Sequence, residues 1–288
     1  YGATDLITPH MDSLAAHGVR FTDHYVNAPM CTASRIGLLT GRDFHRGFER
    51  GRGIFESETT IAELFGDNGY RTGLFGKWHM GGPPYDPLGQ GFDEFLGHRV
   101  GAIDNYSHFS YWSAEKVASL LRGRDAYRED GVYLPDIVTR ESIDFMRRHR
   151  DDPFFLLVSY NQPHYPLQPE VEYLQRYGHL QGDRQTYAAA VTSLDDKIGQ
   201  LLAALDELGL RQDTIIVLMS DNGHSNEEGG GGGSAGPFSG GKKSLLEGGI
   251  RVPGIISWPG RLPQGAVRGQ MTSALDWLPT LATYCGID

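Results

Sequence analysis

The sequence predicts an α/β protein with a mostly parallel sheet and helices on both of its faces. Two apolar runs, PFFLLVSY at 153–160 and DTIIVLMS at 213–220, have the length of strands and alternate with helical segments. Continuous apolar runs of this length are typical of strands buried in a parallel sheet. A polar cluster follows each run directly, NQPHYP after the first and DNGH after the second. Because such sheets bind ligands beyond the carboxyl ends of their strands, both clusters are candidates for a binding site.

The helices are predicted from caps and from apolar residues at helical spacing. Thr8-Pro9 is a capping hydroxyl followed by proline at the first helical position, and Asn68-Gly69 ends a second helix. This second helix spans about 59–67, and the further predicted helices span about 136–150, 184–208 and 277–284. No internal repeat and no clean linker interrupts this pattern. We therefore expect a single domain over residues 1–288.

Composition and charge narrow the possible functions. The chain has 288 residues, of which 39% are hydrophobic and 22% are charged, and this indicates an ordinary globular enzyme. A formal net charge of −10 without a basic stripe argues against a nucleic-acid partner. No apolar run approaches the ~20 residues that a membrane-spanning helix needs. An acidic protein that binds an anion has to gather its cations locally, so the convergence of lysine, arginine and histidine decides the function.

Two cysteines are too few for a disulfide framework. Cys285 is predicted to be a buried thiol, the usual state of a free cysteine. Cys31 lies in APMCTASRIGLLTGR (28–42), at the start of a short helical run. A helix N-terminus favours negative charge, so it suits a reactive thiolate or a bound tetrahedral oxyanion. From this stretch alone, a buried thiol and a catalytic cysteine are equally good interpretations of Cys31.

The wider pattern resembles the type I sulfatases. CTASRIGLLTGR is similar to their signature, C-x-P/A-S-R followed by an apolar pair and T-G-R. Further blocks follow in the order of that family: GKWHMG, GFDEFLG, NQPHYPLQP, SDNGH and GGKKSLLEGGIRVPGIISWPG, with TPHMDSLAAHGVRFTDHYV before them. The resemblance covers nearly the whole chain and implies an alkaline phosphatase-like fold, with a mostly parallel sheet between helices. It also implies that the first strand and the smaller C-terminal subdomain of that family lie outside this sequence.

The resemblance implies a nucleophile made after translation. In that family the cysteine corresponding to Cys31 is oxidised by a maturase to formylglycine, whose hydrate is the nucleophile. Ser34 and Arg35 then serve both recognition by the maturase and the active site. Ala33 stands where proline is usual, and this form resembles the one handled by an anaerobic, radical-type maturase, which implies a bacterial source.

Hydrolysis of a sulfate ester needs cations around the sulfate oxygens and a proton for the departing alkoxide. The resemblance assigns Lys77 to the sulfate, and His79 to the proton of the second hydroxyl. Side chains two apart on an extended segment point the same way, so we expect this pair to face one site. His164 is expected to contact the sulfate and the leaving oxygen, and Lys242 corresponds to the family lysine.

Two further positions are weaker candidates. Ser107, in NYSH, resembles a serine that contacts sulfate in several members of the family. Asp221 and Asn222 are either a solvent turn at a strand end or hard oxygen ligands that suit calcium. The resemblance implies calcium, completed in that family by two adjacent aspartates on its first strand. This sequence has no such pair before its first helix.

Together these features predict a calcium-dependent, formylglycine-containing sulfatase. Its partners are a sulfated sugar or polysaccharide, whose degradation it serves, and the maturase. By resemblance we expect a periplasmic or secreted location. Two alternatives stay open: a phosphonate monoester or phosphodiester hydrolase of the same superfamily, and a non-catalytic anion-binding relative.

Overall fold

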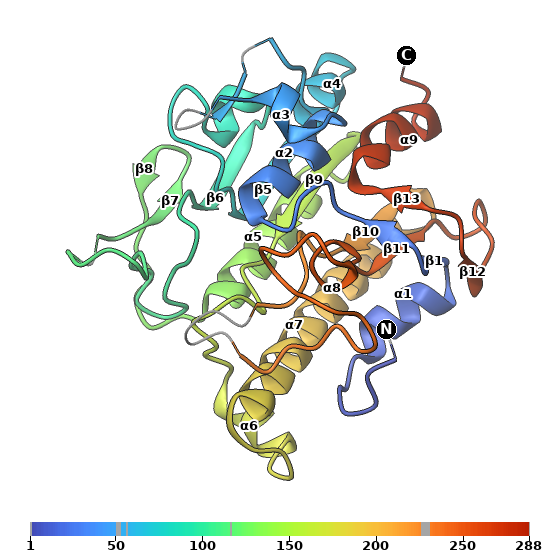
Figure 1. Ribbon diagram of the computed structural model, residues 1–288. Helices are drawn as coiled ribbons and strands as arrows, with labels where there is room; N and C mark the ends of the chain where they lie inside the picture. Colours follow the sequence, from blue (N-terminus) through green and yellow to red (C-terminus); the bar gives the residue numbers. More distant parts are fainter. Residues whose placement is uncertain (1, 50–52, 56, 116, 226–230, 288) are drawn as a thin grey trace. The chain divides into compact units, whose positions relative to one another are not determined.

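The computed structural model describes two compact units of the chain, in residues 2–49, 53–55, 57–115, 117–225 and 231–287 (Figure 1). Unit 1 comprises Tyr1–Met30 and Gln162–Thr272, and unit 2 comprises Cys31–Asn161 and Ser273–Asp288. The expectation of a single domain stays a prediction. In the part of the chain that is described, no helix is both long and apolar enough to span a membrane.

Unit 2 is built on a five-stranded sheet in the order β8-β7-β6-β5-β9. Its strands are β5 (Arg71–Lys77), β6 (Glu94–His98), β7 (Leu120–Arg122), β8 (Asp125–Ala126) and β9 (Phe154–Ser159). β5 pairs in parallel with both β6 and β9, while β7 and β8 continue the sheet as antiparallel strands. The parallel strand predicted at 153–160 is therefore confirmed. It is half-buried rather than fully buried, because β9 lies at the edge of this sheet.

Helices cover both faces of this sheet. They are α2 (Cys31–Thr40), α3 (Phe44–Gly47), α4 (Ile61–Asp67), α5 (Leu134–Arg148), α9 (Trp277–Tyr284) and the short η1 (Pro87–Gln90) and η3 (Ala274–Asp276); a small pair of strands, β3 (Phe48–Glu49) and β4 (Gly53–Ile54), completes the unit. Neighbouring residues of β5 serve opposite faces: Leu74 packs into the cluster that contains Ile36 of α2, and Phe75 packs into the cluster that contains Phe145 of α5. The predicted layers, sheet between helices, are confirmed in this unit.

Local signals explain several of these helices. The hydroxyl of Thr60 accepts the N–H of Glu63, and the carboxylate of Glu63 accepts the N–H of Thr60, a reciprocal cap that begins α4. The final helix has the predicted bounds, Trp277–Tyr284. Cys285, the C-cap of this helix, is half-buried, so the prediction of a buried thiol is wrong. Its position at a helix end leaves one side of it in solvent.

Unit 1 contains a four-stranded sheet in the order β10-β11-β1-β12. Its elements are α1 (Pro9–Ala16), β1 (Val19–Phe21), β2 (His24–Tyr25), α6 (Val171–Arg176), α7 (Gly182–Glu207), η2 (Arg211–Asp213), β10 (Ile216–Met219), α8 (Glu247–Ile250), β11 (Gly254–Ser257), β12 (Ala266–Arg268) and the start of β13 (Thr272–Ser273). The strand predicted at 213–220 is β10, which is half-buried rather than buried and pairs antiparallel with β11. A parallel pair needs a crossover, usually a full helix, and the described part of the β10–β11 connection holds only the four-residue α8.

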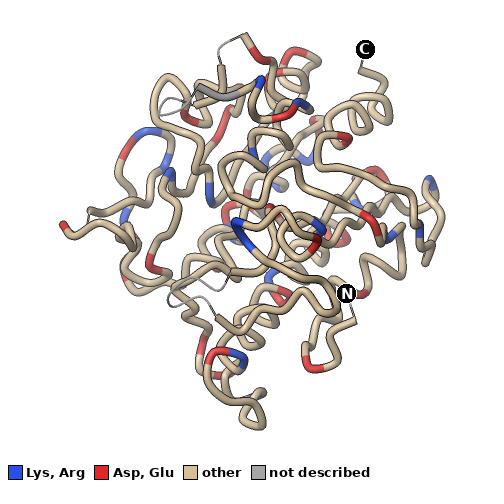
Figure 2. The backbone as a smooth tube through the Cα atoms, in the orientation of Figure 1, with Lys and Arg blue, Asp and Glu red and all other residues tan. Residues whose placement is uncertain are grey.

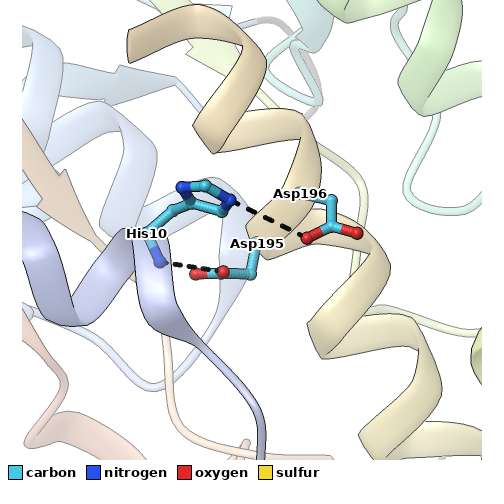
Figure 3. Close-up of side chains that lie close together, drawn as sticks. All are labelled: His10, Asp195 and Asp196. Atoms are coloured by element: carbon cyan, nitrogen blue, oxygen red, sulfur yellow. Dashed lines mark hydrogen bonds and ion pairs between the residues drawn. The ribbon is translucent and has the colours of Figure 1, made fainter. Parts of the chain in front are cut away.

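The first turn of α1 is capped by a distant carboxylate. Pro9 occupies the first turn as predicted, but the side chain of Thr8 makes no capping hydrogen bond. The carboxylate of Asp195, on α7, instead accepts the backbone N–H of His10 at 3.0 Å (Figure 3). It also accepts the backbone N–H of Met11, at 2.8 Å. The sequence-based prediction of a threonine cap is wrong because this carboxylate takes the N–H groups that the hydroxyl would have bound.

Candidate active site

Basic residues are scattered through both units. Figure 2 shows lysine and arginine interspersed with aspartate and glutamate along the described chain, without a single basic stripe. Any anion site therefore depends on a local cluster of cations. One such cluster, in unit 2, surrounds Cys31.

Cys31 is the first residue of α2 and its side chain is 5% exposed. The ammonium of Lys77, at the end of β5, lies 3.6 Å from the Cys31 Sγ. Lys77 is itself only 2% exposed. A helix N-terminus and a buried ammonium both favour a negative group at the position of the sulfur. The predicted placement of Cys31 at the start of a helix is thereby confirmed, and the structure brings Lys77 to it.

Arg35 and Ser159 hold this arrangement together. Arg35 Nη1 donates to the carbonyl of Lys77 at 2.9 Å and to Ser159 Oγ at 2.6 Å. Ser159 Oγ in turn donates to the same carbonyl at 2.7 Å. A triangle of hydrogen bonds thus connects α2, β5 and β9. Gly76 is required beside it, since a Cβ on Gly76 would lie 2.0 Å from the carbonyl oxygen of Ser159.

Sequence reasoning missed Ser159. A serine at the end of an apolar strand carries no signal of its own, and its partners lie 124 and 82 residues away. Ser34, which the resemblance placed in the site, is 1% exposed. Its Oγ has no hydrogen-bond partner among the described residues. A buried hydroxyl in that state has its hydrogen-bonding capacity available to a ligand.

A buried neutral histidine adjoins the cluster. His98 pairs in register with Lys77 across β6 and β5. Burial holds the pKa of His98 well below its usual value, and the charges of Lys77, Arg35 and His79 lower it further, against the opposing effect of the hydrogen bond to Val100. A carbonyl only accepts, so Nδ1 of His98 carries a proton and donates it to the carbonyl of Val100 at 3.0 Å. His98 therefore contributes no charge, and the positive charge stays on the lysine and the arginine.

His79 reaches the cluster by a turn rather than along a strand. β5 ends at Lys77, and His79 has a left-handed backbone with φ of 59°. The expected alternation of side chains along an extended segment therefore does not apply to this pair. Thr32 Oγ1 donates to the carbonyl of His79 at 2.9 Å, and the imidazole lies against Gly101, where an added Cβ would come within 2.9 Å of the ring. These contacts hold a backbone conformation that costs a non-glycine residue about 1–2 kcal/mol.

Unit 1 brings together two other predicted residues. The Nζ of Lys242 lies 3.3 Å from Nε2 of His164, and Nδ1 of His164 lies 2.7 Å from the carbonyl of Tyr165. A carbonyl only accepts, so Nδ1 carries the proton and Nε2 offers its lone pair to the ammonium. Lys242 also lies 5.7 Å from the centroid of the Tyr165 ring, within the range of a cation–π contact. The pair is a proton donor and a proton acceptor in direct contact.

Asp221 and Asn222 follow β10 directly. Asn222 Nδ2 donates to the carbonyl of Gly223 at 2.9 Å, and Ser220 Oγ donates to the carbonyl of Asn222 at 2.9 Å. Asn222 Oδ1 is buried and has no hydrogen-bond partner among the residues that the structure describes. An amide oxygen in this state, next to a carboxylate, fits a hard divalent cation.

A second group of metal-ligand type, His10, Asp195 and Asp196, is explained by structure. Their ligand atoms lie within 4.8 Å of one another (Figure 3). Both oxygens of Asp195 already accept N–H groups of α1, and burial raises the pKa of Asp195 against the effect of those bonds. Asp196 accepts the hydroxyl of Tyr173 at 2.8 Å. Since these oxygens are engaged, the group serves to cap α1 against α7.

Ser107 is engaged differently from the prediction. Its hydroxyl donates to Asp104 Oδ1 at 2.8 Å, and the backbone N–H groups of Tyr106 and Ser107 bind the same oxygen. A hydroxyl has one proton, so in this arrangement Ser107 accepts but does not donate to a further ligand. Its contact with sulfate stays a prediction.

Fold and geometry define the class of protein: an α/β protein of the alkaline phosphatase-like type, with a buried cysteine at a helix N-terminus beside a buried ammonium. The family model described as Sulfatase matches residues 1–287. The chain belongs to the sulfatase family.

Several characterised relatives are similar over the whole chain. Human arylsulfatase A is 34% identical over 313 residues, covering 99% of this chain and 61% of that protein. Mouse N-acetylgalactosamine-6-sulfatase is 34% identical, covering 97% of this chain and 58% of that protein. The crystal structure of Ps i-CgsB in complex with k-i-k-neocarrahexaose has a TM-score of 0.91 and 33% identity, covering all of this chain and 68% of that one. The chain thus spans about three fifths of the length of arylsulfatase A and of N-acetylgalactosamine-6-sulfatase.

Ser159→Ala should lower kcat on a chromogenic aryl sulfate about tenfold. The change removes one acceptor of Arg35 and one donor to Lys77, and hydrogen bonds of charged groups contribute about 1.5–3 kcal/mol. The matched control is Ser142→Ala, which removes a buried hydroxyl bonded within α5 to Val138. Equal loss of kcat in both variants, or a kcat unchanged in Ser159→Ala, would contradict the role of Ser159 in holding Arg35 and Lys77 in place. Urea midpoints of both variants separate the effect from stability.

Proposed function

We propose that the protein is a sulfuric ester hydrolase that removes sulfate from a sulfated sugar or polysaccharide. The observation that carries the proposal is the buried ammonium of Lys77, 3.6 Å from Cys31 Sγ at the N-terminus of α2. Membership of the sulfatase family supports the reaction. The sugar class is supported by a relative named N-acetylgalactosamine-6-sulfatase and by a similar structure in complex with k-i-k-neocarrahexaose.

Formylglycine made from Cys31 by a maturase is part of the proposal. Its hydrate would supply two hydroxyl groups where Sγ lies, one to attack sulfur and one whose deprotonation expels the sulfate. Arg35, 2.6 Å from Ser159, and the helix N-terminus stabilise negative charge at that position. Lys77 neutralises sulfate oxygens, and His79 accepts the proton of the second hydroxyl. An exported location, periplasmic or secreted, completes the proposal.

His164 and Lys242 serve the leaving oxygen. When the bond from sulfur to the sugar oxygen breaks, its electron pair stays on that oxygen. A sugar alkoxide is strongly basic, so it needs a proton as the bond breaks. The ammonium of Lys242 holds that proton beside Nε2 of His164, and the Nδ1–H tautomer keeps Nε2 available as an acceptor. The pair can therefore both donate the proton and recover it.

Asp221 and Asn222 would hold calcium through the carboxylate and through Oδ1. The bound cation would polarise a sulfate oxygen and offset its charge. The buried Oδ1 that lacks a hydrogen-bond partner in the described structure supports this assignment over a simple solvent turn. The group formed by His10, Asp195 and Asp196, whose side chains are also of metal-ligand type, supplies a control for this calcium assignment.

Residue 31 should be formylglycine in active protein and cysteine in protein made without a suitable maturase. Peptide mass spectrometry over residues 28–42 measures the two states, and activity should follow the modified fraction. Cys31→Ala should have less than about 0.1% of wild-type kcat, since no nucleophile remains. Full activity of wholly unmodified protein would contradict the mechanism.

Faster turnover of a phosphonate diester than of a sulfate ester would favour the alternative function, a phosphonate monoester or phosphodiester hydrolase.

His164→Ala and Lys242→Ala should each lower kcat/KM on a sugar sulfate about 100-fold or more, the usual scale of general acid catalysis. On 4-nitrophenyl sulfate, whose leaving group needs little protonation, the loss should stay under about tenfold. Lys243→Asn is the matched control, because Lys243 is an exposed neighbour with a left-handed φ of 72° that asparagine tolerates. Equal losses on both substrates would assign His164 and Lys242 to sulfate binding alone.

Calcium should raise the melting temperature and the activity of the intact protein, and EDTA should reverse both effects. Asp221→Ala should abolish this response, because a cation stabilises only the state that binds it. His10→Ala and the exposed Asp213→Ala are controls that should keep the full response. Loss of the calcium response in His10→Ala but not in Asp221→Ala would move the metal to the α1–α7 group.

A further inference from the structure

The loop that joins β6 to β7 begins and ends beside the cation cluster. β6 ends at His98 and β7 begins at Leu120, and these two residues pair in register. β5 and β6 are parallel, so this loop leaves the sheet at the edge where β5 ends at Lys77. The described residues 99–115 and 117–119 of this loop therefore leave the sheet at the same edge as Lys77, which faces Cys31.

Backbone contacts hold the middle of this loop close to His79. The imidazole of His79 lies against Gly101, where an added Cβ would come within 2.9 Å of Cε1 and Nε2. The next residue, Ala102, accepts a hydrogen bond from the backbone N–H of Tyr111 at 3.0 Å. The backbone of Tyr111 is therefore bonded to the residue that follows the one packed against His79, within unit 2.

The tip of the loop exposes apolar side chains. Trp112 is 60% exposed, Val117 51% and Tyr111 42%. The two aromatic rings form an edge-to-face pair, with centroids 5.2 Å apart and an interplanar angle of 80°. The N–H of Ser110 donates to the carbonyl of Val117 at 3.0 Å, which closes the tip and keeps Val117 on it. Apolar side chains grouped in this way on a surface are typical of a ligand contact.

We propose that Tyr111 and Trp112 bind a sugar ring of the substrate next to the sulfated ring, so that the enzyme prefers sulfated oligosaccharides to sulfated monosaccharides. This inference rests on the proposed function. The C–H face of a sugar ring is apolar and covers an aromatic ring, while its hydroxyl groups stay at the rim. Glu115, exposed on the same tip, offers a carboxylate to those hydroxyl groups.

The size of the surface favours a sugar over a protein partner. Aromatic side chains bury about 150–250 Å² each, so the exposed parts of Tyr111, Trp112 and Val117 together offer roughly 300 Å² at most. A stable protein interface needs about 800 Å² from each partner. A sugar ring matches the smaller area, and continuity with His79 places it on the path of an extended substrate.

Steady-state kinetics of the intact protein test this aromatic platform, the pair formed by Tyr111 and Trp112. The substrates are 4-nitrophenyl sulfate and a panel of sulfated galactan and glycosaminoglycan mono- and hexasaccharides. For hexasaccharides that the wild type desulfates, Trp112→Ala should raise KM about 5- to 10-fold with kcat unchanged, the scale of one aromatic contact. Trp112→Phe should restore most of the loss. Tyr284→Ala, which removes another exposed aromatic of unit 2, should change nothing.

Each other outcome overturns a different statement. An unchanged KM for the hexasaccharides in Trp112→Ala, or the same loss on 4-nitrophenyl sulfate, overturns the platform and leaves the proposed function standing. A correctly modified wild type that desulfates nothing in the panel overturns the proposed function, and the platform with it. Binding without turnover gives a second measurement in Cys31→Ala: hexasaccharide should change tryptophan fluorescence. Trp112→Phe should remove that change and Trp258→Phe should keep it, since Trp258 is the other partly exposed tryptophan while Trp78 and Trp277 are buried.

Discussion

The buried ammonium of Lys77 is the constraint on which the rest of unit 2 depends. A charge taken out of water costs several kcal/mol unless polar groups and counter-charges surround it. β5 carries it to the N-terminus of α2, beside Cys31, and the bonds of Arg35 and Ser159 fix the carbonyl of the same residue. His98 stays neutral beside it and adds no repulsion. An arrangement of this kind is most stable when an anion occupies it.

With a net charge of −10, the protein as a whole does not attract anions, so an anion site needs a local concentration of cations. An acidic surface repels anions at long range, so attraction to the site acts only over the short distance that salt does not screen. The contact between Lys242 and His164 is also a local arrangement of charge and acceptor. Its tautomer is set by the carbonyl of Tyr165, and that single backbone bond determines which nitrogen faces the ammonium. The backbone therefore sets the tautomer, and the two side chains supply the ammonium and the acceptor nitrogen.

Parts of the fold were predictable because their causes are local. The caps of α4 and the bounds of α9 depend on residues within one or two turns, and the strand at 153–160 is visible as an apolar run. The direction of the strand at 213–220 was not, because pairing depends on the chain that returns to it. The cap of α1 was assigned to Thr8 and belongs to Asp195, since a carboxylate brought in by α7 binds the same N–H groups.

The candidate site divides in the same way. By itself the sequence determined the residue types and their order: a cysteine at a helix start, the lysine that meets it, the paired lysine and histidine, and the Asp221-Asn222 step after a strand. Only the tertiary structure decided how they are held. Ser159 donates to the carbonyl of Lys77, 82 residues away in the chain, and the hydroxyl of Ser107 donates to Asp104. The physical reason is that side-chain hydrogen bonds act over about 3 Å, so strand register and loop closure, not proximity along the chain, choose the partners.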